Sequence, residues 1–328
     1  MADYNILSGM QNNSYYMDNR PSFRGEPVVE QFGGSHMVMT NVIQETKTKY
    51  ISLDTKFRDE YNYNSVANYN LTLPERINQV KSMRVLSVNL PMTFYNISSN
   101  MDNNVFTLMF DSASQVITVP EGNYTQTTLT NTINSLLPKD VSLSFSCGTD
   151  ISFGTSQFMF QSNITKKSLT ISFAVDVSGN TNKYNVKSHL GWLLGFRKPS
   201  YTFSSTYPTN VVSSIRSEGI LDLSGKKYLF LALDEFSNAS HSSSFLSYLS
   251  RSVVNRNIIA RLDIDTRVPF GSYETANLRN GMLVSDLRTY SNERVDLQKC
   301  NIQLVNEYGQ PVSLNNMDFS LCLELTHS

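Results

Sequence analysis

Apolar and polar residues alternate at every second position through most of the chain from Lys49 onward. The segment 318–325 shows this most clearly, because Phe319, Leu321, Leu323 and Leu325 fall on one face and polar residues, with Cys322, on the other. A period of two is typical of a half-buried β-strand. About a dozen such segments, separated by turn signals, predict a sandwich or barrel. The main ones are 50–53, 70–73, 80–90, 104–110, 115–119, 141–147, 157–161, 169–175, 228–236, 245–249, 257–264, 282–287 and 295–305.

Two local features break the alternation. In 80–90 the apolar positions change face once, between Val85 and Leu86, which predicts a β-bulge. Between 129 and 137 an apolar residue recurs at spacings of i, i+4, i+7 and i+8, which predicts a helix with one apolar face. Asn123 or Thr125 can cap its first turn, and Pro138 ends it. We expect this helix to lie across a sheet.

Many strands, a single helix and long loops favour a jelly-roll β-sandwich with insertions over a shorter immunoglobulin module. We expect the apolar block 189–196, which holds the only Trp, to plug one end of the core. No segment rich in Pro, Gly or charge divides the range 46–328. One enlarged sandwich over 46–328 is therefore the preferred organisation, and two smaller sandwiches remain the alternative.

Residues 1–45 differ from the rest because they show no sustained apolar period. Disordered tails are usually poor in aromatic residues, yet this segment contains several aromatic and Met side chains. We expect an extended N-terminal arm that becomes ordered on a protein partner, since such side chains serve extended segments as anchors. The candidate interface residues are Tyr15, Tyr16, Phe23, Phe32, Met37 and Met39.

Composition points to protein partners rather than to nucleic acid or membrane. The chain has 27 Lys and Arg against 28 Asp and Glu, which leaves no net field to attract phosphate backbones. Neither a signal-peptide pattern nor a run of about 18 apolar residues is present, so we expect no direct membrane insertion and no secretion by that route. Three widely separated Cys residues indicate a reducing site of assembly.

The sequence offers little catalytic chemistry. The four His residues are scattered without metal-ligand spacing, and the common phosphate-loop, dinucleotide and nucleophile-elbow motifs are missing. We therefore expect no catalytic residue, no cofactor and no metal. Two acidic pairs, Asp263 with Asp265 and Asp234 with Glu235, are interpreted as solvated strand ends, with Arg256, Arg261 and Arg267 as possible surface partners.

Three motifs carry a resemblance to a known family. They are VPEGNYT at 119–125 followed by Leu129 and 133–134, LGWLLGF at 190–196, and a closing hairpin from 301–304 through Gly309 to 319–321. In this order the motifs resemble minor capsid proteins of large icosahedral double-stranded DNA viruses of eukaryotes, including their penton-like jelly-roll relatives. The resemblance spans about 46–328.

The resemblance implies a non-catalytic β-sandwich that cements or links capsomers through protein contacts. Its partners would be the major capsid protein and other minor capsid proteins, with self-association also possible. It would reside in the virion capsid after assembly in the host cytoplasm. A vertex penton protein of the same capsid is the alternative within this family.

Two readings from other classes stay open. A carbohydrate-binding jelly roll would use Tyr201, Tyr207 and Tyr273 near Asp263 and Asp265. A cupin-like enzyme would need several His residues on inward strand faces, which four dispersed His residues disfavour.

Overall fold

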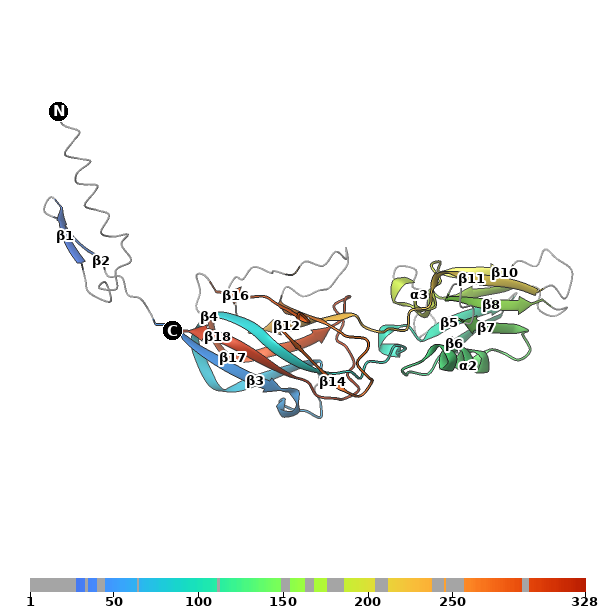
Figure 1. Cartoon of the computed structure of the whole chain (residues 1–328), viewed down its shortest axis with the longest axis horizontal. Helices are drawn as coiled ribbons and strands as arrows, with labels where there is room; N and C mark the ends of the chain where they lie inside the picture. Colours follow the sequence, from blue (N-terminus) through green and yellow to red (C-terminus); the bar gives the residue numbers. More distant parts are fainter. Residues whose placement is uncertain are drawn as a thin grey trace, which may run out of the picture.

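The computed structural model describes residues 28–32, 35–39, 45–63, 65–110, 113–148, 154–162, 168–175, 186–203, 212–237, 245, 257–290 and 295–328. Over these ranges the fold is mostly β, with curled antiparallel sheets of the jelly-roll type, as the alternation predicts (Figure 1). In the same ranges, α2 (Gln126–Leu136) is the only helix longer than four residues. Within this described part of the chain, none of the helices has the length and apolar character needed to span a membrane.

A nine-stranded sheet forms one body of the molecule. Its strands follow the order β15-β13-β12-β17-β4-β18-β3, and β14 and β16 also pair with β4. The strands are β3 (Lys47–Asp54), β4 (Asn68–Pro91), β12 (Tyr228–Asp234), β13 (Ile258–Asp263), β14 (Tyr273–Asn277), β15 (Leu283–Ser285), β16 (Arg288–Thr289), β17 (Val295–Val305) and β18 (Ser320–His327).

The 24-residue strand β4 curls this sheet. Its first half pairs with β17, from Asn68 to Val80, and its second half pairs with β18 up to Asn89. The strand therefore runs through both parts of the sheet. In the second half, Cys322 pairs with Ser87 and Leu323 with Val85, so Leu86 is an extra residue. This confirms the predicted bulge, which keeps Val85 and Val88 both buried.

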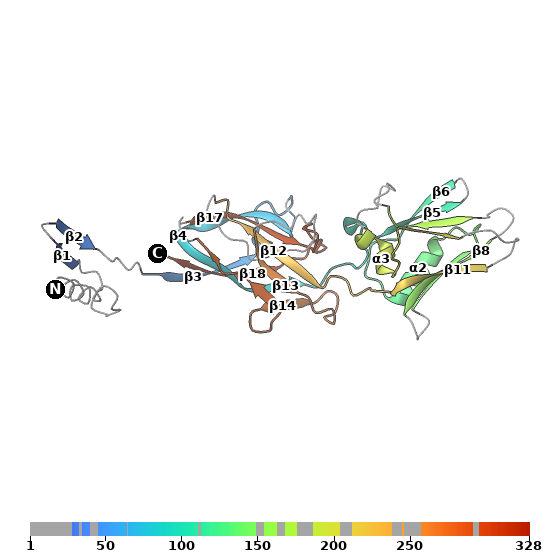
Figure 2. The ribbon, with the colours of Figure 1, turned by 90° about the horizontal axis from the view of Figure 1, so that it is seen from above.

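A four-stranded and a three-stranded sheet form a second body with α2 and the short helix α3 (Leu190–Leu193). Figures 1 and 2 show this body at the end of the molecule opposite the C-terminus. Its core contains a group of Phe rings, in which Phe158 lies 4.7 Å from Phe145 and 5.8 Å from Phe196 between centroids. The strands are β5 (Val105–Phe110), β6 (Ala113–Thr118), β7 (Leu143–Cys147), β8 (Thr155–Gln161), β9 (Leu169–Ser172), β10 (Ser200–Phe203) and β11 (Val212–Ile220).

The predicted helix is present and covers a sheet. Thr125 caps it in a capping box with Thr128, while Leu129 and Ile133 are fully buried. Asn134 fixes the helix to β7, because its side chain donates to the Phe145 carbonyl at 2.7 Å and accepts from the Phe145 amide at 2.8 Å. Capping and one apolar face are local signals, which is why the sequence predicts this element well.

The buried side chains form two large separate clusters, one in each body, and we call these the first core and the second core. The preference for one enlarged sandwich over two smaller ones stays a prediction. The second core is an insertion between β4 and β12, and the chain enters and leaves it through residues 92–104 and 221–227, which we call the two crossings. Asn96 in the first crossing donates to the carbonyl of Leu223 in the second and also to the carbonyl of Tyr124. Because these crossings are short and ordinary in composition, they give no linker signal in the sequence.

The apolar block 189–196 lies in the second core, where Leu190, Leu194 and Phe196 are buried. Trp192 itself is only half-buried, and the guanidinium carbon of Arg197 lies 4.0 Å from its ring centroid. The block therefore packs as expected, but its Trp covers the edge of the core rather than filling it.

Part of the expected arm forms a hairpin of β1 (Val28–Phe32) and β2 (Ser35–Met39). The register pairs Phe32 with Ser35 and Val28 with Met39. The sequence signal for this hairpin is the Gly33-Gly34 dipeptide between two apolar segments, which favours a two-residue hairpin loop. Tyr15, Tyr16 and Phe23 lie outside the described residues.

Candidate interaction surfaces

The first acidic pair is placed as the sequence predicts. Arg261 lies 2.8 Å from Asp263, and Arg267 lies 2.7 Å from Asp265, each between side-chain nitrogen and oxygen. The hydrogen bonds from Arg267 lower the pKa of Asp265 to about 2. Arg256 lies outside the described residues. Both carboxylates thus have their own cations at the surface, where such pairs contribute little to stability.

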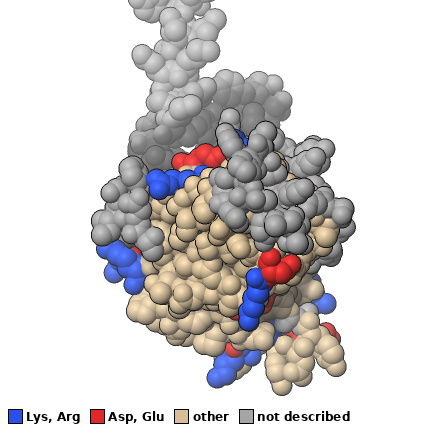
Figure 3. Space-filling model, turned by 90° about the vertical axis from the view of Figure 1, so that its right-hand side faces the viewer, with Lys and Arg blue, Asp and Glu red and all other residues tan. Residues whose placement is uncertain are grey.

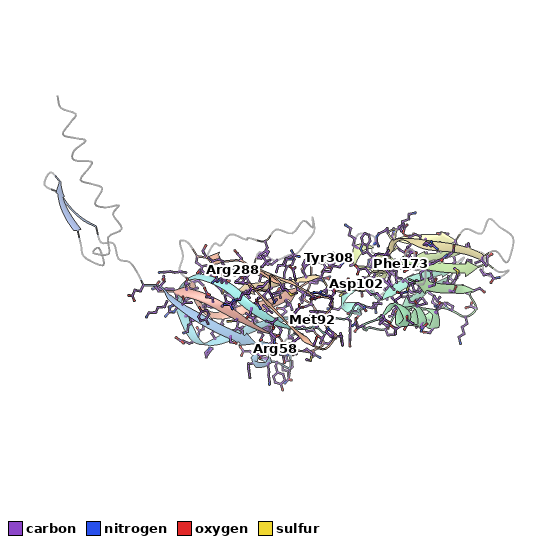
Figure 4. All side chains as sticks on the ribbon, viewed as in Figure 1. Arg58, Met92, Asp102, Phe173, Arg288 and Tyr308 are labelled. Atoms are coloured by element: carbon purple, nitrogen blue, oxygen red, sulfur yellow. The ribbon has the colours of Figure 1, made fainter. Side chains whose placement is uncertain are left out.

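The second acidic pair is different, and its interpretation as a solvated strand end is wrong for Glu235. This carboxylate is buried, with Arg288 Nη1 donating to its Oε2 at 2.7 Å and the Tyr290 hydroxyl donating to its Oε1 at 2.9 Å. Arg288 also donates to the carbonyls of Leu233 and Asn257 (Figure 4). The pair fastens the end of β12 to β16, and local sequence could not reveal a partner so distant in the chain.

The described ranges show where most of the His residues and possible metal ligands lie. Those ranges contain no group of three or more His, Cys, Asp or Glu side chains placed to hold a metal. His189 is buried, with Nδ1 3.0 Å from the carbonyl oxygen of Asp102. His327 lies in β18 and His36 in β2, while His241 lies outside the described residues.

The residues of the carbohydrate reading are not brought together. Tyr201 packs against the second core, and its hydroxyl donates to Glu218 at 2.5 Å. Tyr273 lies on β14 beside the first core, where its hydroxyl donates to the Asp318 carbonyl at 3.2 Å. Tyr207 lies outside the described residues. Tyr201 and Tyr273 therefore do not share one surface around Asp263 and Asp265.

The junction between the cores holds a buried cation. Lys226 has its Nζ 3.5 Å from Glu307, and burial lowers the pKa of its ammonium group. The side chain lines shallow cavities together with Met101, Asn306 and residues of both crossings. In Figure 4, Met92, Asp102 and Tyr308 mark this region.

The loop that follows β3 exposes several aromatic side chains. We call residues 55–63 the aromatic loop. Phe57 is 78% exposed, Tyr61 62% and Tyr63 89%, although aromatic residues usually bury most of their surface. Nothing in the sequence of residues 55–63 indicates such a loop, because they show neither a helical nor a strand period and contain no strong turn dipeptide. Exposed aromatic side chains of this kind are enriched at protein interfaces.

Hydrogen bonds to the segment before β18 fix the first residues of the aromatic loop. The buried Thr55 donates from its amide to the Phe319 carbonyl at 3.0 Å and from its hydroxyl to Asp318 at 2.9 Å. Arg58 donates to the same Asp318 carboxylate at 2.9 Å and to the Thr55 carbonyl at 2.8 Å (Figure 4). A loop that is already fixed loses little conformational freedom on binding.

Little charge covers the outer end of the second core. Figure 3 looks onto this end and shows that most of its described surface carries uncharged residues, with Lys, Arg, Asp and Glu at a few places. This agrees with the low charged fraction of 17% for the whole chain. Such a surface suits packing against other proteins better than attraction of a polyanion.

Comparison with known proteins gives structural likenesses only. No protein-family model matches the sequence, and no curated protein matches it. A selenomethionine-labelled mavirus penton protein has a TM-score of 0.39 at 8% identity, covering 87% of this chain and 100% of that one. A chain of the Sputnik virophage, solved by electron cryo-microscopy, has a TM-score of 0.35 at 11% identity, covering 85% of this chain and 97% of that one.

Proposed function

We propose that this protein is a structural component of the capsid of a large icosahedral DNA virus and works through protein-protein contacts. The main supporting observation is that two of the three motifs of the family resemblance coincide with structural units. The 119–125 motif links β6 to α2, and the 190–196 motif forms α3 with its buried neighbours. The expected closing hairpin is wrong, because its strands β17 and β18 do not pair with each other but lie on opposite sides of β4. Its partners would be the major capsid protein, minor capsid proteins and further copies of this chain.

Within the capsid, the shape favours a vertex penton over a cement between capsomers. The second core is inserted between β4 and β12 and stands at the far end from the C-terminus (Figures 1 and 2). One core can therefore make the shell contacts while the other projects outward. A cement protein beneath the facets would need contact surfaces along most of its length.

Particle composition tests this function. We expect the protein to co-purify with intact particles at five copies per vertex, as measured by quantitative mass spectrometry against the major capsid protein. Electron cryo-microscopy of the same particles should place it at the five-fold axes. A copy number that scales with facet capsomers would instead support the cement role, and its absence from purified particles would refute both placements.

The aromatic loop gives a more local prediction. Replacing Phe57 and Tyr63 together by Ser should leave the fold intact, because both side chains are exposed and contribute little to either core. Loss of such anchors typically weakens an interface by about tenfold or more. We expect incorporation into particles to fall accordingly, measured by mass spectrometry. Phe236→Ser is the matched control, because this ring is 60% exposed elsewhere on the molecule, and equal losses for both variants would contradict a role for the loop.

The arm gives a second prediction. Deleting residues 1–45 should leave the two cores folded, because no described core residue belongs to this range. We expect incorporation to be impaired, since Tyr15, Tyr16, Phe23, Phe32, Met37 and Met39 are the proposed anchors on neighbouring subunits. Normal incorporation of the shortened chain would show that the arm is not needed for assembly.

A further inference from the structure

Strand β3 forms an open edge of the nine-stranded sheet. It pairs with β18 along its full length, from Lys47 with His327 to Asp54 with Ser320, and with no other described strand. Figure 1 shows it along the lower front side of the first body. An edge strand of eight residues presents a row of backbone groups to which another chain can pair.

The residues that offer these groups follow from the register. The Thr55 amide donates to Phe319 on the β18 side, and bonded positions alternate along an antiparallel pair. Lys49, Ile51 and Leu53 therefore bond to β18. The amide and carbonyl groups of the intervening residues, Thr48, Tyr50 and Ser52, face the open side.

The side chains of β3 also indicate a missing neighbour. Ile51 and Leu53 point toward the first core but remain only partly buried, whereas Leu323 and Leu325, on the adjacent β18, are fully buried. Burial thus falls off at the last strand of the sheet. One more strand beside β3 would cover the apolar surface of Ile51 and Leu53 that is left in water.

The β1–β2 hairpin lacks a larger sheet to join among the described strands. Its two strands pair with each other and with no other described strand. A two-stranded hairpin is marginally stable at best in water and needs further strands or a packing partner. Its strand sequences, VVEQF and SHMVM, are mostly apolar, and their only charged residue is Glu30, while β3 begins with Lys47. In Figures 1 and 2 the hairpin lies clear of the two bodies.

We propose that the open edge of β3 receives the β1–β2 hairpin of a second copy, so that the sheet continues from one molecule into the next. The inference rests on the proposed function in one respect, that a shell brings copies side by side. The hairpin pairs through main-chain groups, as in other cases of strand addition. Within one molecule the hairpin does not pair with β3, because β2 pairs only with β1 among the described strands and the hairpin lies clear of the first body.

Residue-resolved hydrogen exchange of the purified full-length chain tests the proposal. With rising protein concentration, exchange at Thr48, Tyr50 and Ser52 should slow by at least about tenfold, because pairing protects amides that were open to water. Exchange at Lys49, Ile51 and Leu53 should be slow at every concentration and serves as an internal control. The variant that lacks residues 1–44 should show no such concentration effect.

A second variant blocks the edge without touching the hairpin. Ser52→Pro removes a donor on the open side and leaves the bonds to β18 intact, and edge strands tolerate Pro at such positions. It should abolish the concentration-dependent protection of Thr48 and Tyr50, while Ser52→Ala should retain it. If Ser52→Pro also loses the protection of Ile51 and Leu53, the substitution has disturbed the pairing of β3 with β18. The test then rests on comparing the full-length chain with the variant that lacks residues 1–44.

Two results would overturn the proposal. Protection that does not depend on concentration would assign the edge to the arm of the same chain, and absence of protection at any concentration would leave the edge unoccupied. Both measurements use purified protein without particles. They therefore fail or succeed independently of whether the protein is found at capsid vertices.

Discussion

Arg288→Met is expected to lower the free energy of unfolding of the first core by about 3–5 kcal/mol, the usual cost of removing one partner from a buried ion pair. The guanidinium is almost completely buried, and its loss leaves the Glu235 carboxylate buried without its cation. The carbonyls of Leu233 and Asn257 each lose the Arg288 donor at the same time, although Asn257 keeps its bond from the Leu233 amide. Burial of unpaired polar groups explains the size of the effect.

Denaturant unfolding followed by circular dichroism measures this loss. The control is Arg267→Met, which breaks an exposed pair with Asp265 and should change the free energy of unfolding by no more than about 1 kcal/mol. Combining Arg288→Met with Glu235→Gln should recover part of the stability, because no charge is then left unpaired. Similar small losses for Arg288→Met and Arg267→Met would show that the buried pair contributes no more to the free energy of unfolding than the exposed pair.

Phe158→Ala should destabilise the second core by about 3–5 kcal/mol, since it removes a fully buried ring and leaves a cavity. The Phe158 ring lies 4.7 Å from Phe145 and 6.0 Å from Phe106 between centroids, so several contacts are lost together. Hydrogen exchange should show faster opening of β5, β7 and β8. Met159→Ala, on the opposite and 38% exposed face of the same strand, should have a much smaller effect.

The same measurement decides how the range 46–328 is organised. If the two cores unfold independently, Phe158→Ala leaves exchange in β4, β17 and β18 unchanged. Equal acceleration in both cores would instead support one cooperative unit, which is the organisation preferred from the sequence.

The local periodicity of apolar residues is enough to predict much of the fold. The alternation in 318–325 predicts β18, the helical spacing in 129–137 predicts α2, and the change of face at Leu86 predicts the bulge in β4. Each of these signals lies within a few residues of its consequence. The jelly-roll class follows from the number of such strands, because short alternating segments cannot bury their apolar faces without layering.

Long-range pairing could not be read in the same way. Nothing near Glu235 indicates that Arg288 will neutralise it, and nothing in the crossings around Asn96 indicates that a second core is inserted. Of the candidate site, the arm residues Phe32, Met37 and Met39 lie in the hairpin strands, and their role as anchors stays a prediction. The aromatic loop became visible only through the exposure of its side chains.

Strand β18 sits between β3 and β4, although it is made long after both. Thr55, which follows β3, and Asp318, which precedes β18, are hydrogen-bonded although they are 263 residues apart in the chain. During synthesis on a ribosome, β3 therefore cannot pair with β18, its only neighbour among the described strands, until nearly all of the described chain has been made. Under the proposed strand exchange, nascent chains would display no docking edge, and joining between copies would be postponed until each polypeptide has finished folding.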